Sequence, residues 1–283
     1  MQDLIFNIGR ELLQVITLVK VAVAVSMVVI LSLIAEFVSP RVAGIISGYP
    51  LGAAIVLFFI GLEISSTFAA ESAVYTILGL IATQCFAYAY YKVSLLLRSD
   101  KKLFNILVAS FISSVVYTVI ALVLRYLKVN LWLSLTLATC SILFFDRLLK
   151  KIKDVKIDNI IKLSTKILLL RACVAALIIV VITSIAKLVG PNLAGLFSAF
   201  PITMLPFIAI IHYTYDTVHV HSIIKNIPRG IFSLLVYSFA VAVLYPSCGV
   251  YVGTLVAYVF ATIYLILITG GLKAGRIRSY LKF

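Results

Sequence analysis

The sequence predicts an all-α integral membrane protein with about nine transmembrane helices, organised as two four-helix repeats of inverted topology joined by a connecting helix. Three observations predict this class: the hydrophobic composition, the positions of the basic clusters, and a repeat at a fixed offset. Of the 283 residues, 63% are hydrophobic and 12% are charged, whereas a soluble domain has about 25% charged residues. The composition therefore excludes an ordinary soluble protein.

Apolar runs of about 18 residues or more are long enough to cross a bilayer, and they define the predicted spans. In chain order the predicted spans are Leu12–Val38, Pro50–Phe68, Val74–Leu97, Leu103–Leu127, Leu131–Leu149, Ile167–Val189, Pro201–Tyr215, Ile231–Tyr245 and Gly249–Thr269. They divide the chain into three parts. These are a first membrane repeat over 1–130, a connecting span with a basic cytoplasmic loop over 131–166, and a second repeat with a basic tail over 167–283.

The net charge of +14 comes from basic residues that gather between the apolar runs. The four basic clusters are Arg98–Lys102, Arg147–Lys166, Lys225–Arg229 and Lys273–Lys282. Lys and Arg in short loops favour the cytoplasmic side of a membrane, and two predicted spans separate each cluster from the next. This pattern predicts a multi-pass plasma (inner) membrane protein with its N-terminus outside and its C-terminus in the cytoplasm. The bilayer, and no nucleic acid, is the expected partner of the positive charge.

Two segments interrupt the apolar sequence with prolines and glycines: SPRVAGIISGYP at 39–50 (the first motif) and GPNLAGLFSAFP at 190–201 (the second motif). They match at an offset of 191 − 40 = 151 residues. The matched pairs are Pro40 with Pro191, Gly44 with Gly195, Ser47 with Ser198, Pro50 with Pro201, Lys20 with Arg171, and Gly79 with Gly230. Five predicted spans separate the two repeat starts. That number is odd, so the two copies are expected to face opposite ways.

Proline and glycine in matching positions of inverted halves indicate a transporter's binding site, because irregular backbone is tolerated at membrane depth only inside protein or beside water. The candidate pathway residues are Pro40, Gly44, Ser47, Pro50, Pro191, Gly195, Ser198 and Pro201. The alternative is that each motif is a tight turn between two packed helices at the membrane interface. The sequence leaves both readings open.

The segment LAGLFSAFPITMLPFIAIIHY at 193–213 resembles the GlpM-like family of small bacterial inner-membrane proteins. The matching residues are Ala194, Gly195, Leu196, Phe200, Pro201, His212 and Tyr213, and the likeness extends from Arg171 to Leu244. The first repeat keeps Ala43, Gly44, Tyr49 and Pro50 but has Gly61-Leu62 in place of the His-Tyr pair. The resemblance implies a fused version of an antiparallel pair, with a link to envelope polysaccharide production or glycerol metabolism.

Charged residues inside the predicted spans are the remaining candidates, because each costs about 2.5–3.5 kcal/mol to insert. Lys20 and Arg171 either attract an anionic substrate or extend to the nearest headgroups. His212 and Asp216, four residues apart, are expected on one helical face, where they form either a proton relay or a structural pair at the interface. Glu63 is a further proton-coupling candidate.

Two functions from different classes follow from these features. The first is a transporter of a small envelope-related solute, either anionic or linked to a lipid headgroup, and it predicts a cavity shared by the two motifs. The second is an accessory or scaffold protein of an envelope polysaccharide system, acting as a homodimer or within a complex, and it predicts a solid interior with apolar outer grooves. No nucleophile elbow, phosphate-binding loop or metal-ligand spacing occurs. An enzyme, a cofactor and a metal are therefore not expected.

Overall fold

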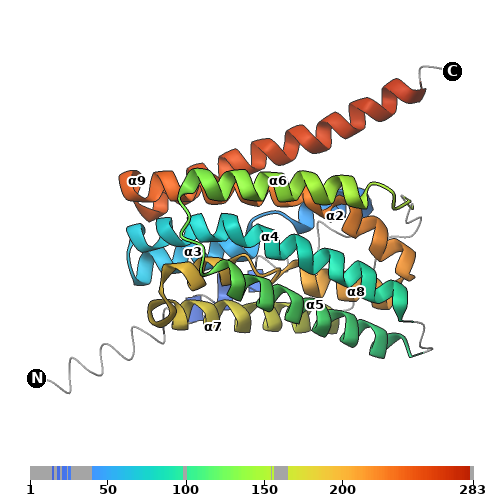
Figure 1. Ribbon diagram of the computed structural model, residues 1–283, viewed down its shortest axis with the longest axis horizontal. Coiled ribbons are helices and arrows are strands. Elements are labelled where there is room, and N and C mark those ends of the chain that lie inside the picture. The colour runs from blue at the N-terminus through green and yellow to red at the C-terminus, as the bar shows by residue number, and fades with distance from the viewer. Residues whose placement is uncertain are drawn as a thin grey trace, which may run out of the picture.

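The described part of the chain is a bundle of α-helices (Figure 1). The computed structural model describes residues 15, 18–19, 21–23, 25–26, 40–97, 101–153, 155 and 165–280, without the side chains of 40, 41, 43, 165–171 and 271–280. The helices are α2 (Pro40–Ser47), α3 (Leu51–Glu63), α4 (Ser66–Leu96), α5 (Lys102–Leu124), α6 (Leu131–Leu149), α7 (Thr165–Ser198), α8 (Met204–Thr214) and α9 (Thr217–Tyr280). These ranges contain no strand, so the all-α prediction is confirmed.

Six stretches of the described residues are long and apolar enough to cross a membrane. They are Gly44–Glu63, Ser66–Leu96, Lys102–Leu124, Leu131–Leu149, Ala172–Ser198 and Thr217–Gly270. Their outward faces carry large apolar side chains such as Trp132, Leu177 and Leu255, which suit a lipid environment and not water. The chain is a multi-pass membrane protein. The first predicted span, Leu12–Val38, lies almost entirely outside the described residues.

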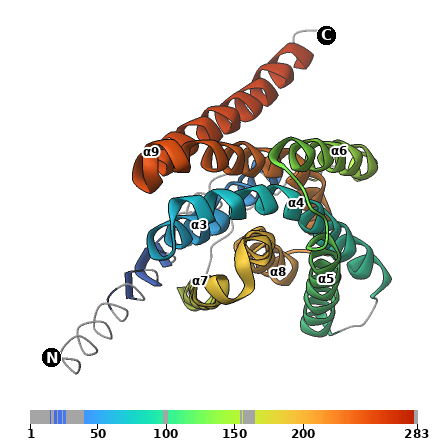
Figure 2. The same ribbon diagram turned by 60° about the vertical axis from the view of Figure 1, so that its left-hand side comes forward.

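Helix α4 lies at the centre of the bundle. It contacts α3, α5, α6, α7 and α9, and Figure 2 shows α6 and α9 on one side of it and α7 and α8 on the other. Its face is rich in small residues, including Ala69, Ala73 and Gly79, so neighbouring helices approach its backbone closely. The Ser65 side chain caps its start by accepting a hydrogen bond from the Phe68 N–H (3.1 Å), as expected for an N-cap serine.

Helix α9 departs from the prediction. A span was expected to begin at Ile231, after a basic loop, whereas the helix begins at Thr217 and contains both the 225–229 cluster and Pro228. That expectation was wrong because a proline inside a membrane helix is tolerated when neighbouring groups satisfy the freed backbone. The predicted boundary before Gly249 corresponds to a sharp bend, where Gly249 has φ +74°. The bend divides α9 into a first leg before Gly249 and a second leg after it.

Helix α4 and the first leg of α9 run in opposite directions in the bundle. In Figure 1, α4 runs from left to right, while the first leg of α9 starts at the right and returns to the left. Helix α5 then runs back to the left, and the second leg of α9 runs back to the right. The end of α4, the end of α6 and the end of α9 lie at the same end of the bundle.

Candidate functional site

The first motif is a short helix that ends inside the bundle. Helix α2 ends at Ser47, and α3 begins at Leu51 after a break of three residues. The N–H of Tyr49 donates to Ile46 O (3.0 Å), and the N–H of Leu51 donates to Tyr49 O (2.7 Å). Gly48 and Pro50 in the break are buried. The first motif is therefore a helix break that is buried within the protein.

The second motif has the same construction. Helix α7 bends at Gly190, with φ +80°, and continues from Pro191 to Ser198 before the chain breaks and α8 begins. The N–H of Phe200 donates to Phe197 O (3.0 Å), and the N–H of Ile202 donates to Phe200 O (2.7 Å). Each bond joins residues 151 positions after those of the corresponding bond in the first motif. The two breaks thus share one backbone conformation.

The motif glycines allow backbones to touch. A Cβ placed on Gly44 would lie 2.5 Å from Ile223 O in α9, and a Cβ on Gly195 would overlap Ser72 O in α4. Ser72 and Ile223 are themselves 223 − 72 = 151 residues apart. Only glycine fits such close approach. Each short helix is therefore packed by its glycine against the long helix of the other half.

Serine hydroxyls close each short helix in the same way. Ser47 Oγ donates to Gly44 O (2.7 Å), and Ser198 Oγ donates to Gly195 O (2.7 Å). The second motif receives additional donors: Thr83 Oγ1 donates to Ala199 O (2.7 Å), and the Tyr117 hydroxyl donates to Leu196 O. Hydroxyls of α4 and α5 therefore occupy the carbonyl groups at this helix end.

The two breaks meet at a small central void. Its volume is about 30 Å³, enough for a water molecule and little more. It is lined by Ser47, Gly48, Tyr49, Gly52, Ala53, Thr83, Ser198, Ala199, Phe200, Pro201, Met204, Ile231 and Leu234. Of the predicted pathway residues, Ser47, Ser198 and Pro201 line this central void. Gly44, Gly195 and the buried Pro50 hold the helices around it.

The electrostatic character of the central void comes from helix ends. Gly52 and Ala53, in the first turn of α3, and Met204, the first residue of α8, are among the lining residues. The first N–H groups of a helix have no partner within it, and the helix dipole adds partial positive charge there. Since hydroxyls already occupy carbonyls of the second motif, the arrangement favours a hydrogen-bond acceptor or an anion in the central void.

Four other predicted pathway residues lie away from this void or outside the description. Pro40 begins α2, and Pro191 begins the terminal part of α7, so each stands at the far end of its short helix. Lys20 lies outside the described residues, and Arg171 belongs to α7 without a described side chain. The expected meeting of Lys20 and Arg171 with the motifs therefore stays a prediction.

The expected His212–Asp216 pair is not formed. Helix α8 ends at Thr214, so the two residues do not share a helical face, and Asp216 is exposed just before α9. His212 is instead 3% exposed, with Nδ1 3.0 Å from the Tyr90 hydroxyl and Nε2 3.4 Å from Thr217 Oγ1. Tyr90 is 122 residues away in sequence, and no local spacing indicates that partnership.

Glu63 does not join this group either. It is the last residue of α3, and Figure 1 shows α3 and α8 ending at opposite ends of the bundle. The three proton-coupling candidates are thus distributed over two ends of the molecule.

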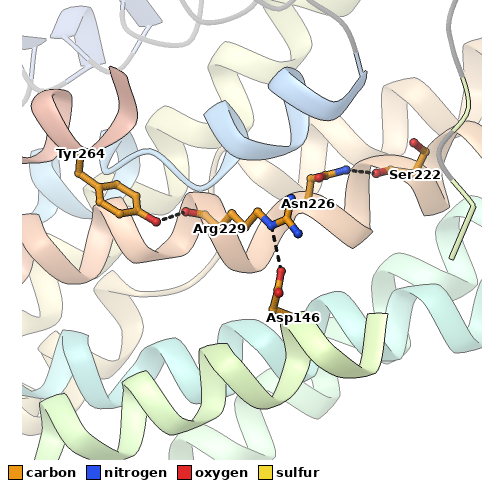
Figure 3. Close-up of polar contacts among 5 residues, drawn as sticks. All are labelled: Asp146, Ser222, Asn226, Arg229 and Tyr264. Carbon is orange, nitrogen blue, oxygen red and sulfur yellow. Dashed lines mark hydrogen bonds and ion pairs between the residues drawn. The ribbon is translucent and has the colours of Figure 1, made fainter. Parts of the chain in front are cut away.

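An ion pair missed by the sequence reading joins α6 to α9 (Figure 3). Arg229 Nε lies 3.1 Å from Asp146 Oδ1, and the Tyr264 hydroxyl donates to Arg229 O (3.1 Å). One turn earlier in α9, Asn226 Nδ2 donates to Ser222 O (2.8 Å). The sequence signal for this ion pair was Asp146 in the apolar run 131–149, because a carboxylate in a membrane span requires a partner.

An outer groove follows the second leg of α9 and is bordered by Phe58 of α3. Its volume is about 540 Å³. It is lined by Phe58, Tyr251, Thr254, Leu255, Tyr258, Val259, Thr262 and Ile263. The described part of the chain therefore has a water-sized void between the two motifs and a larger apolar groove on its outer face.

Neither a metal-binding cluster among the described residues nor a similar known protein accompanies this geometry. Among the described residues, no three His, Cys, Asp or Glu side chains gather to hold a metal, and the four cysteines are free. Comparison with protein-family models, curated proteins and solved structures gave no match.

Proposed function

We propose that the protein is an inner-membrane transporter built from two inverted repeats, in which the broken helices of the two motifs form the solute pathway. The observation that carries the proposal is the meeting of both breaks at one small void between the helices. Discontinuous helices that meet at the middle of inverted halves are the usual binding site of secondary transporters. The N-terminus is outside and the C-terminus cytoplasmic in this proposal.

Reciprocal contacts at the 151-residue offset support the inverted repeat. Gly44 packs on Ile223 as Gly195 packs on Ser72, and Gly79 contacts Leu196 as Gly230 contacts Ile45. In each case the second contact follows from the first when 151 is added to the residue number of one partner and subtracted from the residue number of the other. Such exchange is the signature of two copies related by a twofold axis.

The proposed solute is small and carries an anionic group, either free or as a lipid headgroup. Two helix N-termini face the central void, and backbone N–H groups at helix N-termini are natural anion sites. The void in this conformation holds only a water-sized group, so transport requires the halves to separate around it. The resemblance to GlpM-like proteins supports an envelope-related solute.

Uptake into proteoliposomes tests the proposal. Purified full-length protein is reconstituted and supplied with radiolabelled inorganic phosphate, glycerol 3-phosphate or succinate, with uncharged glycerol as the comparison solute. Thr83→Val removes the hydroxyl that donates to Ala199 O beside the central void. By disturbing the second break it is expected to lower anion uptake by roughly tenfold, about the cost of one buried hydrogen bond. The matched control is Thr118→Val, whose exposed hydroxyl bonds only within α5. Equal loss in both variants, or no uptake of any anion above empty vesicles, contradicts the proposal.

The second candidate is the accessory or scaffold protein of an envelope polysaccharide system. The outer groove of α3 and α9 favours it, because large apolar grooves mark interaction surfaces. A protein of this kind needs no solute pathway. Thr83→Val would then leave every function intact, while bulky substitutions at Leu255 in the groove would abolish polysaccharide production in cells.

A further inference from the structure

Two buried histidines join α8 and the start of α9 to the end of α4. His212 in α8 is 3% exposed and His221 in α9 is 7% exposed. Tyr90 and Ser94, one helical turn apart on α4, meet them: the Tyr90 hydroxyl lies 3.0 Å from His212 Nδ1, and Ser94 Oγ lies 2.9 Å from His221 Nε2. These four residues are named the imidazole cluster.

Hydrogen-bond inventory constrains the protons of the imidazole cluster. Ser94 Oγ also donates to Tyr91 O (3.0 Å), and a hydroxyl has a single proton. His221 Nε2 therefore donates to Ser94. Either the Tyr90 hydroxyl or Nδ1 can donate in the Tyr90–His212 bond, and Nε2 lies 3.4 Å from Thr217 Oγ1. Protonation of His212 would place a hydrogen on both ring nitrogens.

Among the described residues, the charged groups on the elements around the imidazole cluster are cations or an exposed acid. The cations include the exposed Lys92 near the end of α4, the exposed Lys102 at the start of α5, and Lys225 one turn beyond His221 in α9. Tyr91 packs on the His221 ring at 4.7 Å, and the partly exposed His219 packs on Tyr215 at 5.4 Å. The nearest acid in sequence, Asp216, is exposed. Neither buried ring forms an ion pair with a carboxylate among the described residues.

We propose that the imidazole cluster is a proton-binding latch, closed with neutral rings and opened by protonation, which releases α8 and the start of α9 from α4. A buried charge without a counter-charge is costly, and opening toward water relieves it. With the added proton both ring nitrogens of His212 are donors, so the Tyr90 hydroxyl can then only accept from Nδ1. The repeat mates of His212 and His221 are Gly61 and Ala70, so only one end of the bundle carries the latch.

The latch would free α8 while α3, its counterpart in the first repeat, stays packed. Helix α8 follows the break at 199–203 directly, so releasing α8 would loosen one wall of the central void. Coupling of the proton to solute movement rests on the proposed transport function. The latch itself does not, and it is tested without a transport measurement.

Thiol accessibility measures the opening. In a full-length protein with Cys85, Cys140, Cys173 and Cys248 replaced by Ala, Ile211→Cys reports the buried side of α8 and Tyr213→Cys its exposed side. The rate at which Ile211→Cys reacts with a charged methanethiosulfonate is divided by the rate for Tyr213→Cys. This ratio removes the general effect of pH on thiols. As pH falls from about 8 to about 5, the ratio is expected to rise, by up to about tenfold per pH unit for one linked proton.

Glutamine variants identify the responsible rings. His212→Gln with His221→Gln retains hydrogen-bonding groups but cannot take up the proton, and it is expected to give a low ratio at every pH. His219→Gln is the matched control and should keep the wild-type profile. A flat wild-type profile, or a profile unchanged in the double variant, overturns the latch. A functioning latch in a protein that moves no anion would retain this inference and reject the proposed function.

Discussion

At the scale of the residue, the glycines of the two motifs set how closely helices approach. A leucine at Gly44 or Gly195 would collide with backbone of the opposite long helix, where neither partner can move aside. Such overpacking costs about 1–3 kcal/mol or more. We predict that both substitutions lower the midpoint of thermal unfolding by a comparable amount. Gly270→Leu is the control, because nothing lies within 4 Å of that position. A Gly195→Leu protein as stable as the Gly270→Leu protein would contradict the packing account.

At the scale of the element, the Asp146–Arg229 pair fastens the connecting helix α6 to α9. Arg229→Met leaves the Asp146 carboxylate without its cation, and Asp146→Leu leaves the Arg229 guanidinium without its carboxylate. Both side chains are about one-third exposed (31% and 29%), so we expect a coupling near 1 kcal/mol, toward the low end for contacting pairs. A double-mutant cycle of unfolding free energies measures it, with exposed Lys153→Met as the control. Additive losses in the double variant would show that the pair does not fasten α6.

The helices also show which features of the fold could be predicted from the sequence and which could not. Apolar length predicted α6 to the residue and both ends of α5 within three residues, because bilayer thickness limits helix length. The end of α4 was predicted within one residue, but its start was predicted at Val74, eight residues after the observed Ser66. Only three-dimensional packing decides whether a motif is a turn or a broken helix. The same holds for Pro228, which neighbouring helices tolerate inside α9. The His212–Tyr90 contact spans 122 residues, and no spacing rule reaches so far.

At the scale of the whole molecule, the proposed topology places every basic cluster on the cytoplasmic side. In the cysteine-free background, Lys153→Cys after α6 should resist a membrane-impermeant maleimide added to intact cells. Thr67→Cys at the start of α4 should react with it, because Figure 1 shows this end of α4 opposite the end of α6. Permeabilised cells, in which both positions should react, are the control. The reverse labelling in intact cells would invert the orientation.

The central claim is that both motif breaks belong to one solute pathway, and accessibility from the two sides of the membrane tests it most directly. Ser47→Cys and Ser198→Cys both face the central void, whereas Ala121→Cys is a buried control in α5. A transporter that alternates between inward-open and outward-open states exposes the same pathway to each side in turn. We therefore predict that a charged methanethiosulfonate reaches both motif cysteines when added to right-side-out vesicles and when added to inside-out vesicles, while Ala121→Cys stays unreactive. Motif cysteines that react no faster than Ala121→Cys from either side would contradict the account.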